Sequence, residues 1–174
     1  YTITKMNKRD KFHMFYKQTL ILLSFLMCAI VTSFSFAESI KFNGLIISNL
    51  WIKEPIGNHS MTSGYLTIKN TNTYDERLIA ITSNIAKKSE IHEMIVDNDI
   101  MKMNVLNDGL KIPANSIVYL KPGSYHVMFM KLYKKLKIMS THKINLNFEQ
   151  AGQLNIDFPV HKKFSDIKST KHHH

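Results

Sequence analysis

The chain has 174 residues, 44% of them hydrophobic, which favours one folded domain with a sizeable core over two domains or a disordered chain. Its formal net charge is +10, but no helix-turn-helix, RNP or zinc-finger pattern accompanies the scattered lysines, so nucleic-acid binding is not expected. The single cysteine, Cys28, excludes an internal disulfide framework and a cysteine-based zinc finger.

Residues 1–37 have the pattern of an export signal. Five Lys/Arg residues and one acidic residue give this segment a net charge of +4, and residues 19–36 then run without a charge. Ser35-Phe36-Ala37 places small residues at the first and third positions of a cleavage triplet. We therefore predict a signal peptide cleaved after Ala37 and an exported mature protein that begins at Glu38.

Two other interpretations of this segment stay open. An uncleaved anchor is one, because eighteen uncharged residues approach the ~20 that span a bilayer. A lipoprotein leader is disfavoured because Met27 precedes Cys28, where a small residue is needed. If Cys28 is removed with the signal, a site for a soft metal in the mature domain can use only Met thioethers and His imidazoles.

The segment 38–160 predicts an all-β domain, because short runs of apolar alternation are broken by turn residues and no long amphipathic helix is visible. The expected strands are 40–48, 64–69, 77–82, 89–94, 117–120, 126–130, 143–148 and 153–158. Pro113 and Pro122 flank the strand 117–120, which suits the edge of a sheet. Residues 161–174 are polar and predict a flexible tail, whose His172–His174 end is of a kind that binds divalent metals.

Three short stretches combine histidine with methionine: 90–94, 100–103 and 120–130. Alternate residues of a strand share a face. The pairs and triplets that would point together are His92 with Met94, Met101 with Met103, and His126 with Met128 and Met130. Thioethers and imidazoles suit Cu(I), whereas Ca²⁺ or Mg²⁺ would need several carboxylates and Zn²⁺ binds thioethers poorly.

A purely structural interpretation is weaker here than for isolated residues. A methionine at alternating positions usually fills a core, and a lone strand histidine is usually only a satisfied side chain. Two histidines that each stand two residues before a methionine, near a third methionine pair, exceed what this explains. The stretches therefore indicate a copper site.

The spacing resembles the motif of the PCuAC family of periplasmic copper chaperones. That motif is a His, ten residues, a Met, about twenty-two residues, and then His-x-Met. Ten residues separate His92 from Met103, twenty-two separate Met103 from His126, and Met128 completes His-x-Met. The surrounding sequence is also similar across 38–160, including Asn49-Leu50-Trp51-Ile52, Gly64–Asn70, Leu120–Gly123 and 147–160.

The resemblance implies a cupredoxin-like Greek-key β-sandwich that binds Cu(I) through His92, Met103, His126 and Met128. It also implies delivery of copper to the dinuclear copper site in subunit II of cytochrome c oxidase, sometimes alongside a Sco-type thiol protein. A monomer that meets the membrane only through its partner is expected. By the same comparison, Met94, Met101 and Met130 are shielding or docking residues and not primary ligands.

Several alternatives to this interpretation stay open. His59-Ser60-Met61 is a further His-x-Met in an expected loop, and chance or a transient secondary ligand would both explain it. A blue-copper electron carrier needs a Cys thiolate that the mature chain lacks, and no catalytic arrangement indicates an enzyme. A copper buffer without a dedicated client, or an assembly domain without metal, would also fit a β domain.

Overall fold

The computed structural model describes residues 9, 16–18, 39–57, 59–98 and 100–162. The chain divides into two compact units, residues 1–36 and 37–174. The expected cleavage site and the His172–His174 end lie outside the described residues, as does almost all of the expected signal peptide. Within the described part of the chain, no helix is long and apolar enough to cross a bilayer.

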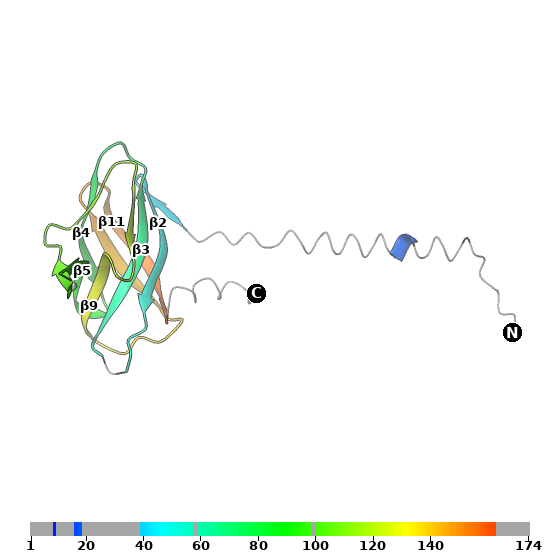
Figure 1. Ribbon diagram of the computed structural model, residues 1–174. Helices are drawn as coiled ribbons and strands as arrows, with labels where there is room; N and C mark the ends of the chain where they lie inside the picture. The colour runs from blue at the N-terminus through cyan, green and yellow to red at the C-terminus, as the bar shows by residue number, and fades with distance from the viewer. Residues whose placement is uncertain (1–8, 10–15, 19–38, 58, 99, 163–174) are drawn as a thin grey trace. The chain divides into compact units, whose positions relative to one another are not determined.

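The second unit is built from strands (Figure 1). These strands are β1 (Ile40–Phe42), β2 (Leu45–Lys53), β3 (Met61–Asn70), β4 (Glu76–Ser83), β5 (Ala86–Asp97), β6 (Ile100–Val105), β7 (Leu110–Ile112), β8 (Ile117–Leu120), β9 (His126–Leu132), β10 (Thr141–Phe148) and β11 (Gly152–His161). The all-β prediction is confirmed.

The strands form two layers that share one continuous hydrogen-bonded path. One layer has the order β6-β5-β9-β3-β2, with β1 added to β2 and β8 added to β3, and the other has the order β11-β10-β4-β7. The layers are joined where β11 pairs in parallel with the end of β2, at Val160 and Ile52. Fully buried aromatic side chains from both layers, Phe129, Phe148 and Phe158, fill the core between them.

The predicted strand 40–48 is wrong in one respect, because a two-residue turn divides it. Phe42 pairs with Leu45, and the intervening Asn43 and Gly44 have φ values of 44° and 79°. Positive φ at both central positions is the requirement of a type I′ hairpin turn, which Asn-Gly meets at low cost. A Cβ at Gly44 would lie 1.9 Å from the Asn72 side chain, so glycine is also required by space.

Other boundaries differ from the prediction at the ends of strands. β6 and β7 were not among the predicted strands; β6 is exposed along its whole length and β7 has three residues. Met61 is the first residue of β3 and not a loop residue. β11 continues to His161, which is buried and whose carbonyl accepts a hydrogen bond from the Glu54 amide. Among the described strands β8 pairs with β3 alone, so its prediction as an edge strand is confirmed.

Candidate metal centre

His92 and His126 face each other across the β5–β9 pair. They are direct partners in the antiparallel register, and their ring centroids lie 5.8 Å apart with an interplanar angle of 52°. The exposed fractions of these residues are only 8% and 5%. The two imidazoles that the sequence places 34 positions apart therefore form one buried pair in the sheet.

The two expected thioether ligands lie diagonally from His92 on the neighbouring strands. Met128 is opposite Glu90 on one side of β5, and Met103 is opposite Met94 on its other side. Diagonal neighbours on one face of an antiparallel pair are about 7–8 Å apart, within reach of long side chains. The register thus places His126, Met128 and Met103 around His92.

All four side chains project from the same face of the sheet. Paired residues share a face, and the intervening residues Ile91 and Val127 are buried in the core on the other side. The same parity extends the set to further residues of β3, β5, β6 and β9. We call the Met/His face the set Met61, Ser63, Glu90, His92, Met94, Met101, Met103, His126, Met128 and Met130.

The His92 ring is held by a carboxylate on its own strand. Its Nε2 lies 3.0 Å from Oε2 of Glu90, whose other oxygen lies 2.5 Å from the Lys88 ammonium. Lys88 and then His92 lower the pKa of the Glu90 carboxyl below its usual value. An ionised carboxylate can only accept hydrogen bonds, so Nε2 of His92 is the nitrogen that donates, and Nδ1 is the nitrogen left to offer a lone pair to a metal ion.

That Nδ1 has no hydrogen-bond partner. Among the described residues it is the one buried side-chain nitrogen or oxygen atom in this state. An unsatisfied buried polar atom is costly and rare in a native protein, and it calls for an explanation such as an ion. The donor chemistry of the site therefore fits a metal ion held at Nδ1 of His92.

The His126 ring is fixed in a complementary way. Its Nδ1 donates to the backbone carbonyl of Ser124 at 3.0 Å, which leaves Nε2 as the atom with the lone pair. The preceding Tyr125 hydroxyl donates to Glu93 of β5, and this bond, together with burial, raises the pKa of Tyr125. The turn before β9 is thereby tied to β5 beside the histidine pair.

The thioethers differ in their surroundings. The Met128 sulfur accepts a hydrogen bond from Ser63 Oγ at 3.8 Å, whereas Met103 on the edge strand β6 is 46% exposed. Both are uncharged donors that do not titrate. Within the described residues no three His, Cys, Asp or Glu side chains converge in a way that could hold a metal ion. The available ligands are therefore neutral imidazole nitrogens and thioether sulfurs, which suit a soft monovalent ion.

Sequence reasoning missed two residues of this face that support the predicted ligands. Glu90 stands two residues before His92, so strand alternation alone would have placed its carboxylate on the same face. Ser63 carries no such signal, because only the pairing of β3 with β9 brings it opposite Met128.

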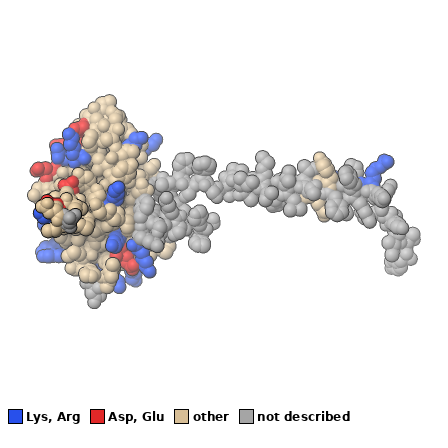
Figure 2. Space-filling view, in the orientation of Figure 1, with Lys and Arg blue, Asp and Glu red and all other residues tan. Residues whose placement is uncertain are grey.

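Charged side chains do not form a single-sign surface on the face drawn in Figure 2. Blue Lys and Arg side chains lie there among red Asp and Glu side chains. Ion pairs of the β domain include Lys102 with Asp97 and Lys111 with Asp75. Mixed charge of this kind gives no continuous basic track for a phosphate backbone.

Comparison with known proteins relates the chain to proteins described as putative lipoproteins. A model of the LpqE-like family, described as "Putative lipoprotein LpqE-like", matches residues 45–160. The "Putative lipoprotein Lxx21020" of Leifsonia xyli subsp. xyli is 29% identical over 123 residues, which cover 71% of this chain and 72% of that protein.

The solved structures that resemble the chain include PCuAC domains. The copper-bound PCuAC domain from PmoF2 has a TM-score of 0.61 and 21% identity, and the match covers 72% of this chain and 99% of that domain. The solution structure of CuI-DR1885 from Deinococcus radiodurans has a TM-score of 0.55 and 23% identity, with 73% of this chain and 83% of that one covered. The prediction of a cupredoxin-like fold is confirmed by these likenesses.

Proposed function

Because the chain belongs to the LpqE-like family and has the fold of PCuAC domains, we propose that it is an exported, non-enzymatic metallochaperone for Cu(I). Copper is its cargo. The proposed ligands are Nδ1 of His92, Nε2 of His126 and the sulfurs of Met103 and Met128.

The observation that carries this proposal is the buried, unpartnered Nδ1 of His92. Its lone pair is fixed by the Glu90 carboxylate at Nε2, and the second imidazole lies directly opposite. Carboxylate–histidine pairs orient ligand rings in metal sites and raise their basicity. The hydrogen bond to Glu90 stabilises the ring but leaves its buried Nδ1 unsatisfied, a cost that a bound ion would remove.

The ligand set explains why the cargo would be Cu(I). Two imidazoles and two thioethers are neutral, so the bound ion would keep its single positive charge beside two buried rings. A divalent ion there would lack a compensating anion among the ligands, which favours Cu(I) over Zn²⁺. Met103 on the exposed edge strand β6 gives one ligand that solvent or a partner can reach.

The client we propose is the dinuclear copper site in subunit II of cytochrome c oxidase, with a Sco-type thiol protein as a second partner. The PCuAC fold supports this choice, and an open Met103 would let a receiving site exchange ligands with the chaperone. We also propose that the chaperone acts as a monomer. A copper buffer would use the same ligands but would have no receiving partner.

Cu(I) titration of the protein against a chelator tests the site. His126→Ala should weaken Cu(I) binding at least about 100-fold, more than the loss of a supporting residue, while the β domain stays folded. His142→Ala, on β10 in the other layer, is the matched control and should bind as the wild type does. X-ray absorption should show both sulfur and nitrogen neighbours, and a spectrum with nitrogen and oxygen alone would contradict the assignment.

Mixing the copper-loaded protein with an apo fragment of subunit II tests the chaperone role. We expect copper to move to the fragment. The transfer is measured by the absorption of the dinuclear copper site that forms in the fragment. Tight binding without transfer would overturn the client and support a buffer.

Export is proposed through residues 1–37, with a periplasmic mature protein that begins at Glu38. The family and the relative are both named as lipoproteins, which makes acylation of Cys28 the competing outcome. Intact mass of the protein from its native envelope distinguishes them. An N-terminus at Glu38 supports cleavage after Ala37, whereas a lipid-modified Cys28 overturns it.

A further inference from the structure

Methionines of the β domain gather on one face. The chain has ten methionines, of which three precede residue 38. Of the other seven, all but Met139 belong to the Met/His face: Met61, Met94, Met101, Met103, Met128 and Met130. This face lies opposite the core, and Met61, Met101 and Met103 are 47%, 62% and 46% exposed. Core packing therefore does not account for them.

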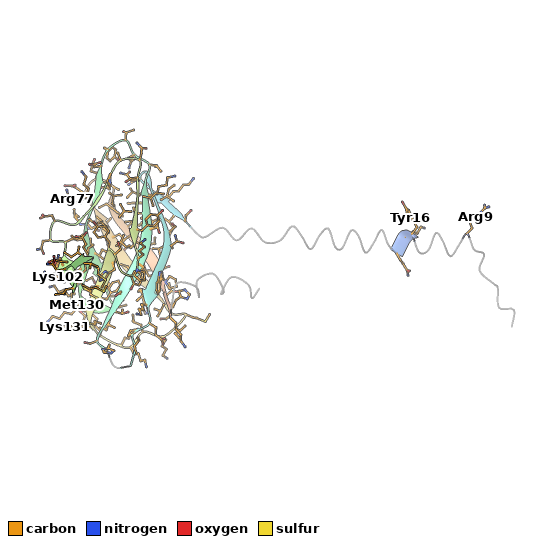
Figure 3. The ribbon with its side chains drawn as sticks, viewed as in Figure 1. Arg9, Tyr16, Arg77, Lys102, Met130 and Lys131 are labelled. Atoms are coloured by element: carbon orange, nitrogen blue, oxygen red, sulfur yellow. The ribbon has the colours of Figure 1, made fainter. Side chains whose placement is uncertain are left out.

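Two of these methionines are not among the four proposed ligands and belong to the paired strands β3 and β9. Met61 and Met130 are direct cross-strand partners, and Met128 follows diagonally from Met61 (Met130 is labelled in Figure 3). Direct partners on one face have Cβ atoms about 4.5–5.5 Å apart and diagonal neighbours about 7–8 Å, so three thioethers from two strands can reach one ion. Met128 is common to this group and to the histidine site.

We propose that Met61, Met130 and Met128 form a second, all-thioether site for Cu(I) next to the His92–His126 site. This proposal rests on the proposed function, because a second copper position has a use only in a protein that handles copper. The shared Met128 would let an ion pass from the exposed Met61 to the buried imidazoles by exchanging one sulfur ligand at a time. No redox step is involved, since the ion stays Cu(I) throughout.

The charges near this group permit a monovalent cation. Lys88 of β5 is opposite Met130, but its ammonium lies 2.5 Å from Glu90 Oε1, which offsets its repulsion of an incoming ion. Thioethers bind Cu(I) and Ag(I) without giving up a proton. The second site should therefore bind soft monovalent ions in preference to Zn²⁺.

The test is a titration of the full chain with Ag(I), a redox-silent analogue of Cu(I). The NMR signals of the Met ε-methyl groups are recorded after each addition. Cys28 is replaced by Ser, and His172, His173 and His174 are replaced by Ala throughout, so that neither a thiol nor this end of the chain competes for Ag(I). The first equivalent should shift the Met103 and Met128 methyls. The second should shift Met61 and Met130, and should shift the shared Met128 again. The double variant M61L/M130L should reduce the stoichiometry from about two equivalents to about one, with the first retained.

Met139→Leu is the matched control, because Met139 is 70% exposed and lies off the Met/His face. It should leave both equivalents in place. A second equivalent that leaves Met61 and Met130 unshifted, or that survives in M61L/M130L, would overturn the second site alone. Failure of the first equivalent to shift the Met103 and Met128 methyls would instead overturn the proposed function.

Discussion

Nε2 of His92 lies 3.0 Å from Oε2 of Glu90, two residues earlier on β5 and on the same face of the sheet. The contact fixes the tautomer of a buried ring and leaves its Nδ1 without a partner. A carboxylate outside the proposed ligand set thus decides which nitrogen of His92 can bind a metal.

Replacing that carboxylate should weaken copper binding while the ligands stay in place. In Glu90→Gln the amide can donate or accept, so Nε2 is no longer held as the protonated nitrogen. We expect Cu(I) affinity to fall by about 10–100-fold in chelator competition. Glu149→Gln, which alters an exposed carboxylate 3.7 Å from Arg77, is the control and should have no effect. Equal affinities for Glu90→Gln and wild type would show that Glu90 does not support the site.

Copper affinity should depend on pH through the histidines alone. Protons and Cu(I) compete for the same ring nitrogens, whereas thioethers do not titrate in this range. The logarithm of apparent affinity should fall with a slope that approaches about 2 per pH unit under acidic conditions, and either His92→Ala or His126→Ala should reduce this slope by about one. Met103→Leu and Met128→Leu should lower affinity with the slope unchanged. An affinity that stays flat from neutral to mildly acidic pH would exclude histidine ligands.

Glu76 should contribute strongly to the free energy of unfolding. This buried carboxylate accepts backbone N–H bonds from Arg77 and Gln150 at one oxygen and from Ala151 at the other, at 2.8–3.0 Å. Glu76→Gln keeps the size but replaces one acceptor by a donor, which leaves a buried N–H unsatisfied. We expect a loss of about 3 kcal/mol in denaturant unfolding, and less than about 0.5 kcal/mol for the exposed Glu149→Gln. Similar losses for the two variants would contradict this role.

His142 should make the domain less stable in mild acid. Burial, and secondly Lys134, lowers the pKa of His142 from its ordinary 6.5. A group whose pKa is lower in the folded state is protonated first in the unfolded chain, so stability falls as pH drops from about 6.5 through the folded value and is unaffected above that window. His142→Gln should reduce the difference in unfolding free energy between about pH 7.5 and about pH 5.5. A larger difference in the variant would show the sign to be wrong.

The local sequence was sufficient to predict most of the strands. Alternation of apolar residues predicted the strands that became β4, β8, β9, β10 and β11, and the prolines beside β8 predicted its edge position. The Asn43-Gly44 turn was also readable, since this dipeptide is the strongest short-range hairpin signal, and the strand predicted through it was an error of interpretation. β6 was not among the predicted strands, and its six residues are all exposed in the structure.

The sequence by itself determined which donors a metal could meet: imidazoles and thioethers at a fixed spacing, with alternation that gave His126 and Met128 a common side. Only the tertiary structure decided that His92 lies opposite His126, that Met103 and Met128 fall on either side of it, and that Met61 meets Met130. The physical reason is strand register. A shift of one residue moves every side chain of a strand to the other face, and register here is set by hydrogen bonds between strands far apart in the chain and by the core packing of residues such as Ile91 and Val127.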